Sequence, residues 1–155
     1  MKQETTTRHD TIVVRRTCAA PVAQVFAAWS QAEALQRWYV PGDASWSSKI
    51  LSHEFRRGGS KRLEFGPPGG PLYTEDCRYE DIVPERRICF VMTILRAGAP
   101  ITTSLVTVEL FAHAQRTDVV VTDQIAILDG GDTAAERERG WGETLDKLLR
   151  LLSRG

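Results

Sequence analysis

The stretch RGWGETLDKLLRLL, residues 139–152, decides the fold class of this sequence. Its apolar residues recur at helical spacing and form one stripe, and acidic residues precede basic ones by four positions on the opposite face. Thr133 and Glu136 have the spacing of a capping box, which starts the helix just after residues 128–132. We therefore predict one long amphipathic helix with its stripe on Ala134, Trp141, Leu145, Leu148, Leu149 and Leu152.

Two glycines, Gly140 and Gly142, flank Trp141 at the edges of this stripe. Each costs a helix interior about 1 kcal/mol relative to alanine. Without a Cβ atom, the helix can approach a sheet closely while the indole fills the remaining gap. We expect at least one of the two glycines to lie at such a contact, and the alternative is that they only fray the first turn.

Before this helix, the sequence predicts one strand, two short helices and six further strands. Residues 11–20 are rich in β-branched side chains, and the proline that follows suits the first turn of a helix over 21–30. Ser30 can cap a second short helix over 31–39. Closely spaced strands pair most economically as antiparallel hairpins, so the order predicts an α+β fold. The strands are apolar–polar alternations bounded by glycine and proline, at 45–55, 60–65, 73–83, 86–96, 101–113 and 117–128.

Charge and composition exclude several functional classes. The 20 basic and 20 acidic residues cancel, which gives no electrostatic basis for binding nucleic acid or an anionic membrane. No apolar run is long enough for a membrane span, and the polar start MKQETTTRHD lacks the hydrophobic stretch of a signal peptide. We therefore expect a cytoplasmic protein with a single domain over residues 1–155, of which residues 1–10 form a polar tail.

No constellation of reactive side chains points to a catalytic or metal site. The cysteines are odd in number and unclustered, and the histidines lack the spacing of metal ligands. The sequence contains neither a Gly-x-Ser-x-Gly elbow nor a phosphate-binding loop followed by lysine. We therefore expect no catalytic residue, no metal and no cofactor. The residues concerned are Cys18, Cys77, Cys89, His9, His53 and His113.

Five segments match a known family in the right order along the chain. They are AAPVAQVFAAWSQAEALQRWYVP (19–41), EFRRGGSKRLEF (54–65), YEDIVPERRICF (79–90), VTVELFAHAQRTDVVVT (106–122) and GWGETLDKLLRLL (140–152). The matching residues of the first segment are Ala20, Pro21, Val25, Phe26, Ala28, Ser30, Glu33, Leu35, Trp38, Tyr39 and Pro41. With these segments the chain resembles the START-like (SRPBCC) superfamily and, within it, the activator of Hsp90 ATPase homologue-like family. Two positions depart from the family pattern, Ala32 where proline is usual and Lys61 where an apolar residue is common.

The resemblance implies a helix-grip fold, in which a seven-stranded antiparallel sheet wraps around the long C-terminal helix. It also implies a cavity between sheet and helix, where we expect a small hydrophobic or amphipathic ligand rather than catalysis. One alternative is a co-chaperone-like interaction module. The eukaryotic co-chaperone carries an additional N-terminal domain for which this sequence has no room, and this argues against a chaperone contact. The other alternative is an enzyme of the polyketide aromatase/cyclase type.

Strand alternation places charged residues on otherwise apolar faces. Lys61, Glu75 and Asp123 are each in phase with the apolar residues of their strand. If these faces point inward, Lys61 and Asp123 should pair with each other or meet a polar group of the ligand, because an isolated buried charge is costly. The alternative is that both lie near strand ends and reach solvent.

The tryptophans divide into two groups. Trp29 and Trp141 lie on apolar helix faces and are expected in the core, whereas Trp38 and Trp46 bracket the loop 39–45 and suit the rim of a cavity. We also expect a homodimer, because an open sheet has exposed edges that need covering. The residues expected at the cavity or its mouth are Trp38, Trp46, Lys61, Tyr79, Met92 and Asp123.

Overall fold

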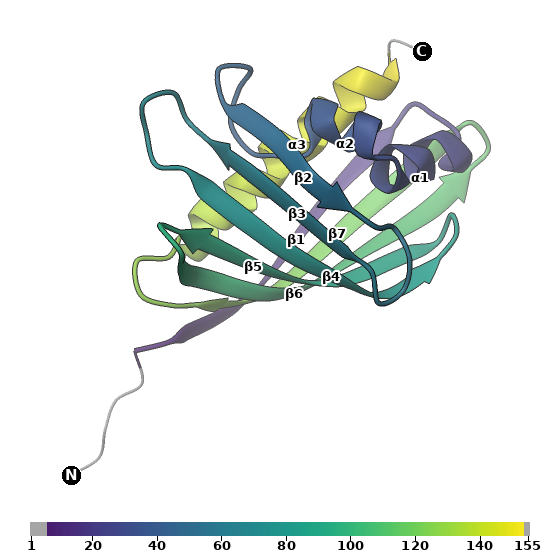
Figure 1. The fold of residues 1–155 in the computed structure, drawn as a ribbon. Coiled ribbons are helices and arrows are strands. Elements are labelled where there is room, and N and C mark those ends of the chain that lie inside the picture. Colours follow the sequence, from purple (N-terminus) through teal and green to yellow (C-terminus); the bar gives the residue numbers. More distant parts are fainter. Residues whose placement is uncertain (1–5, 154–155) are drawn as a thin grey trace.

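The chain folds into a seven-stranded sheet and three helices, of which the last is the longest (Figure 1). The computed structural model describes residues 6–153. β1 begins at Arg8, inside the predicted polar tail, and residues 1–5 of that tail lie outside the described residues. None of the helices in this range is both long and apolar enough to cross a membrane. The elements are β1 (Arg8–Cys18), α1 (Val22–Ser30), α2 (Ala32–Trp38), β2 (Ser47–His53), β3 (Ser60–Gly66), β4 (Tyr73–Val83), β5 (Arg87–Arg96), β6 (Ala99–His113), β7 (Arg116–Ile127) and α3 (Ala134–Ser153).

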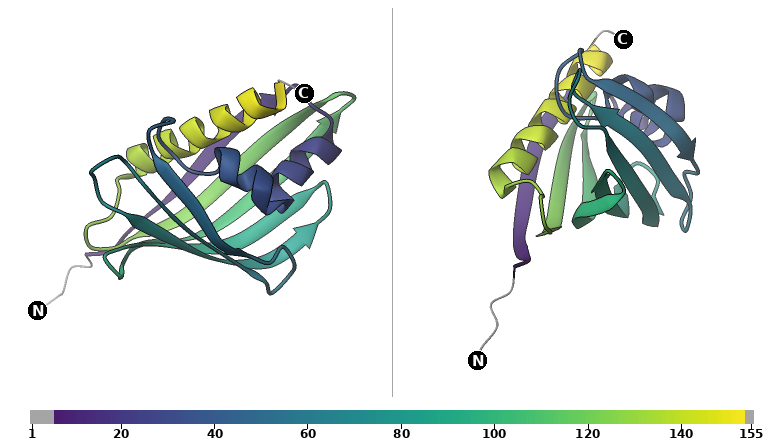
Figure 2. Two further views of the ribbon diagram at one scale, coloured as in Figure 1. Left: turned by 45° about the horizontal axis from the view of Figure 1, so that its top comes forward. Right: turned by 60° about the vertical axis from the view of Figure 1, so that its left-hand side comes forward.

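Neighbouring strands of the sheet run antiparallel, in the order β1-β7-β6-β5-β4-β3-β2. The two edge strands are β1 and β2. They are connected by α1 and α2, which lie on the same side of the sheet as α3 (Figure 2). Register shifts within the β2–β3, β4–β5 and β5–β6 pairs mark bulges, which increase the bend and twist of a sheet. The curved sheet and the long terminal helix confirm the predicted α+β helix-grip fold.

The concave side of the sheet holds α3 (Figure 2). The apolar stripe of this helix packs into the core. Trp141, Leu145 and Leu148 are buried, as the helical spacing predicts. The predicted capping box forms at the start of the helix. The backbone N–H of Glu136 donates to Oγ1 of Thr133 at 3.1 Å, and the backbone N–H of Thr133 donates to Oε1 of Glu136 at 3.3 Å. The beginning of α3 is therefore fixed by local hydrogen bonds as well as by packing.

The two glycines beside Trp141 differ in what surrounds them, and neither lies against the backbone of the sheet. A Cβ atom at Gly140 would lie 3.4 Å from Cβ of Pro41, which is an ordinary contact. At Gly142 it would lie 3.0 Å from Nη2 of Arg16, at the end of a flexible side chain that can shift. Gly142 therefore lies beside a side chain of β1, whereas no strand lies within 4 Å of a Cβ atom at Gly140.

Candidate functional site

A cavity of about 290 Å³ lies between α3, the segment that follows α2 and the concave face of the sheet. Its charged lining residues come from β4, from α3 and from the loop before α3. Ligand sites in proteins commonly occupy about 300–1,000 Å³, so this cavity suits a small molecule. The rest of the wall is mainly aromatic or aliphatic and includes Tyr39, Trp46, Phe65, Tyr73, Met92, Ile94, Ile101 and Trp141.

The segment between α2 and β2 forms another part of the cavity wall. Its Pro41 lies beside Gly140 of α3, and both residues line the cavity. The next residue, Gly42, has a φ of +84°, in the left-handed region that favours glycine. The ring of Trp46 lies against Gly42 so closely that a Cβ atom there would overlap it. This glycine therefore allows the Trp46 indole to lie flat on the segment and to form part of the cavity wall.

Lys61 is buried on the inner face of β3 and forms an ion pair with Glu75 of the neighbouring strand β4. Lys61 is 1% exposed, and its Nζ lies 3.2 Å from Oε2 of Glu75. The ammonium group also lies 3.6 Å from the centroid of the Tyr39 ring, in a cation–π contact. The Tyr39 hydroxyl donates to Glu75, at 3.3 Å from Oε1 and 3.2 Å from Oε2. Because Glu75 lines the cavity and Lys61 does not, the cavity meets the carboxylate rather than the ammonium.

These contacts determine the protonation states around the ion pair. Desolvation on burial lowers the pKa of Lys61, but the surrounding acidic groups, with Glu75 first among them, together outweigh it, and the pKa lies well above its ordinary value. Burial, reinforced by Glu75, raises the pKa of the Tyr39 phenol well above its ordinary value. Lys61 therefore keeps its charge at neutral pH, and Tyr39 keeps the proton that it donates to Glu75.

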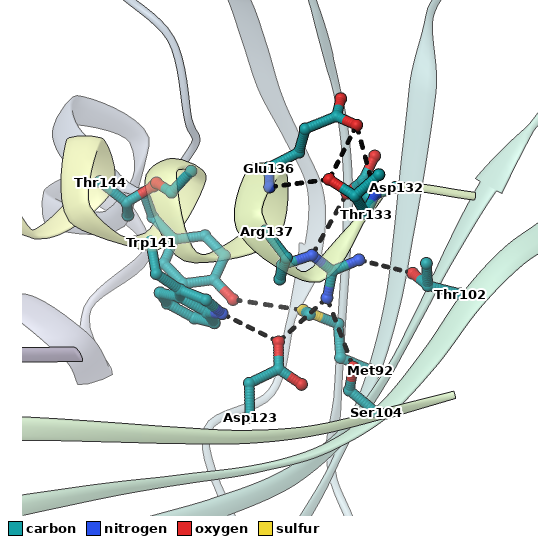
Figure 3. A network of polar contacts seen from close by, with 12 residues as sticks. Met92, Thr102, Ser104, Asp123, Asp132, Thr133, Glu136, Arg137, Trp141 and Thr144 are labelled. Atoms are coloured by element: carbon teal, nitrogen blue, oxygen red, sulfur yellow. Dashed lines mark hydrogen bonds and ion pairs between the residues drawn. The ribbon is translucent and has the colours of Figure 1, made fainter. Parts of the chain in front are cut away.

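A second buried ion pair joins α3 to the sheet (Figure 3). Nη1 of Arg137 lies 3.0 Å from Oδ2 of Asp123, and the Trp141 indole N–H donates to the same oxygen at 3.0 Å. Arg137 also donates to the hydroxyls of Thr102 at 2.6 Å and Ser104 at 3.4 Å, both on β6. Arg137 thus lines the cavity with most of its N–H groups already bonded, and its main effect is to hold the first turns of α3 on the sheet.

Four of the six predicted site residues lie at the cavity or directly behind its wall. Trp46 and Met92 line it, whereas Lys61 and Asp123 are each covered by an ion-pair partner. The predicted pairing of Lys61 with Asp123 is wrong, because each has a nearer partner of opposite charge. The alternative that both reach solvent is also wrong, since both side chains are buried.

Trp38 and Tyr79 lie away from the cavity. The Trp38 indole N–H donates to the carbonyl oxygen of Ala28 at 3.0 Å, and its ring packs edge-to-face on Trp29 with centroids 4.7 Å apart. The placement of Trp38 at the rim is wrong, because the side chain turns back towards α1. Tyr79 is buried further along β4, where its hydroxyl lies 2.9 Å from Nε2 of His53.

Three important lining residues are not among the six predicted ones: Tyr39, Glu75 and Arg137. Strand alternation already placed Glu75 among inward-facing residues, so the sequence contained that information. Arg137 precedes Trp141 by four residues and therefore shares its face of the helix. Tyr39 follows the end of α2, where no periodicity applies. Trp141 is buried in the core, as expected, and it also lines the cavity.

The fold and the cavity together define a class of protein. A curved antiparallel sheet that encloses a small aromatic-walled cavity against one long helix is the architecture of a START-like helix-grip domain. The chain belongs to the family of activator of Hsp90 ATPase homolog 1-like proteins, whose sequence model matches residues 19–153. This match confirms the family resemblance carried by the five sequence segments.

Solved structures share this fold over nearly the whole chain. An uncharacterized protein from Rhizobium leguminosarum is 33% identical with a TM-score of 0.86, over 97% of this chain and 98% of that one. A protein from Rhizobium loti is 34% identical with a TM-score of 0.82, over 94% and 99%. DynU16, from the dynemicin biosynthetic locus, is 23% identical with a TM-score of 0.69 over 93% of this chain and 47% of its own, which shows the fold alone. None of the curated proteins matches the chain.

Proposed function

We propose that this protein binds a small apolar or amphipathic molecule in the cavity between the sheet and α3. The observation that carries the proposal is the lining, in which aromatic and aliphatic side chains from four strands, α3 and the segment after α2 face one space of about 290 Å³. Burial of apolar surface contributes about 25 cal/mol per Å², so an apolar ligand that displaces water from these walls gains free energy. A mainly apolar cavity with few polar groups is the usual form of a small-molecule site.

The ion pair of Lys61 and Glu75 supports a ligand with one polar group. Replacing a buried ion pair by packed apolar residues is often neutral or stabilising, so the fold itself does not require the pair. Its carboxylate lines the cavity, where it offers a polar contact within an apolar surface. This combination suits an amphipathic molecule better than a pure hydrocarbon.

Native mass spectrometry of the freshly purified protein tests the proposal. We expect a co-purified small molecule that is lost when the protein is denatured. The variants Met92→Trp and Val91→Trp locate it, because Met92 lines the cavity while its neighbour on β5, Val91, is 37% exposed. Met92→Trp should fill the cavity and abolish the adduct, and Val91→Trp should leave it in place.

Titration with an apolar fluorescent dye provides the same test for protein that has lost its ligand during purification. The dye should bind the unsubstituted chain and the Val91→Trp variant but not Met92→Trp. Equal binding to both variants would place the ligand outside this cavity, and absence of binding to all three proteins would contradict the proposal.

Catalysis in the same cavity is a second candidate, which the position of Glu75 favours. A carboxylate that accepts a hydrogen bond from a phenol and lines an apolar space can take up and return a proton. Ring closure in a polyketide, as in the aromatase/cyclase members of the superfamily, requires such proton transfers. Turnover of an enolisable aromatic-polyketide mimic that Glu75→Gln abolishes without loss of binding would establish catalysis, and binding without turnover would leave the binding function alone.

A further inference from the structure

We propose that the ligand carries a neutral hydroxyl group on an aromatic ring system, and that this hydroxyl donates a hydrogen bond to Glu75. This ligand class, which rests on the binding function proposed above, is set by three properties of the cavity. They are the carboxylate of Glu75, which can accept further hydrogen bonds, the compensation of its charge by Lys61, and the flat aromatic walls.

Glu75 has hydrogen-bonding capacity that the protein does not use. An ionised carboxylate offers about four acceptor positions on its two oxygens. Lys61 pairs with Oε2 at 3.2 Å, and the single hydroxyl hydrogen of Tyr39 is shared between Oε1 at 3.3 Å and Oε2 at 3.2 Å. Both hydroxyl distances exceed the roughly 2.7–2.8 Å of a good O–H···O bond. Oε1 therefore receives only part of one weak hydrogen bond, and it belongs to a residue that lines the cavity.

The charge balance selects a neutral donor. Lys61 already compensates Glu75, so a cationic head group would add an uncompensated charge to a buried site. A carboxylate head group would meet Glu75 as a like charge. Arg137, the buried cation that lines the cavity, does not offset this repulsion because Asp123 and two hydroxyls of β6 occupy it. Acidic groups are also the majority among the other charged lining residues, which are Asp132, Glu136, Glu143 and Arg139.

The aromatic walls and the size of the cavity select a short, flat ligand. Phe65 and Tyr73 are stacked at an interplanar angle of 29° with centroids 5.5 Å apart, and both line the cavity. Trp141 of α3 and Tyr39, which follows α2, contribute rings at 72° to each other. A volume of about 290 Å³ equals the space of roughly ten water molecules. One ring or two fused rings fit this space.

Three naphthalenes of similar size test the ligand class: 2-naphthol, 2-methylnaphthalene and 2-naphthoate. Each is titrated into the protein at pH 7 while the NMR signals of the Trp46 and Trp141 indole N–H groups, both on the cavity wall, are followed. We expect naphthol to bind about tenfold or more tightly than methylnaphthalene, because a hydrogen bond to a charged acceptor contributes at least that factor. Naphthoate should bind most weakly of the three.

Two variants change the contact with Glu75, and a third is a matched control. Tyr39→Phe removes the internal donor and frees the acceptor, so naphthol affinity should rise severalfold while methylnaphthalene affinity stays constant. Tyr39→Phe/Lys61→Met/Glu75→Leu makes the cluster apolar, so the two ligands should bind almost equally. The control Arg62→Met/Asp76→Leu replaces an exposed ion pair on the same two strands and should leave all three affinities unchanged.

The outcomes separate the ligand class from the binding function. Equal binding of naphthol and methylnaphthalene by the unsubstituted chain would overturn the role of Glu75 and leave a hydrophobic site. Tighter binding of naphthoate would also overturn it, since a positive group would then recognise the ligand. No binding of any of the three would contradict the ligand class and the binding function together. If the triple variant fails to fold, the Tyr39→Phe variant decides alone. The proposal is overturned if the preference for naphthol over methylnaphthalene is no larger in this variant than in the unsubstituted chain.

Discussion

Replacing Lys61 by methionine removes one member of a buried ion pair and leaves the other without compensation. The side chains of Lys61 and Glu75 are 1% and 5% exposed, and the charged atoms lie 3.2 Å apart. Loss of one partner from such a pair costs about 3–5 kcal/mol, because the remaining charge stays buried. Since domains of this size unfold with about 5–15 kcal/mol in total, the Lys61→Met variant should lose a large part of its stability.

The next residue along β3 provides a matched control. Arg62 lies 3.3 Å from Asp76, but their side chains are 56% and 46% exposed, so this pair contributes at most about 1 kcal/mol. The double variant Lys61→Met/Glu75→Gln should recover most of the loss, because it removes the uncompensated charge while Tyr39 keeps an acceptor for its hydroxyl. The difference between the two ion pairs thus isolates the effect of burial.

Urea denaturation followed by circular dichroism gives the free energies of unfolding that this comparison requires. The reasoning would be refuted if Lys61→Met lowered the free energy of unfolding no more than Arg62→Met does, or if the double variant recovered none of the loss.

Four further predictions concern other parts of the molecule. Gly140→Ala should raise the free energy of unfolding by about 0.5–1 kcal/mol, because the new Cβ atom makes an ordinary contact with Pro41 at 3.4 Å, and should weaken ligand binding, because it adds a methyl group to the cavity wall. Lower stability in urea would reveal a clash instead. Trp141→Phe should lower the free energy of unfolding by about 1.5–3 kcal/mol more than Trp29→Phe does in the same assay. The Trp141 indole N–H donates to a buried carboxylate, whereas the Trp29 indole N–H has no partner among the described residues. Burial and then the charge of Lys61 lower the pKa of His53 from 6.5 to about 4, so stability should fall as the pH drops from 6.5 to about 4, and His53→Gln should flatten that part of the curve. Light scattering at high concentration should give a homodimer, because both sheet edges can pair, and a monomer would reject this expectation.

The strands could be predicted from the sequence because most of them bury one face. The alternation at 60–65 and 73–83 agrees closely with β3 (Ser60–Gly66) and β4 (Tyr73–Val83). The start of β1 could not be predicted in this way, because its first residues are polar and exposed. They continue the strand only because they pair with β7, where Arg8 lies opposite Ile127. Pairing of this kind is a long-range property that local polarity does not reveal.

The site could be predicted only in part, because alternation determines the face of a residue but not its neighbours. Lys61 and Asp123 point inward as their phase indicates, yet β4, β5 and β6 lie between their strands. Their partners come from the adjacent strand and from α3, and the distances depend on how the sheet curves around the helix. Trp38 shows the same limit, since the crossing of α1 and α2 decides the direction of its side chain.

The hydrogen bonds of Arg137 and Trp141 also bear on the rate at which a ligand exchanges. They hold the first half of α3 to β6 and β7, so this wall moves outward only if buried polar contacts break. The part of the wall formed by residues 40–46 turns at Gly42, and its backbone hydrogen bonds are short-range, such as that from the Trp46 backbone N–H to the Asp43 carbonyl at 3.1 Å. Loop segments of this kind move within nanoseconds to microseconds. We therefore expect the proposed ligand to enter and leave by movement of residues 40–46, while the sheet and α3 stay in place.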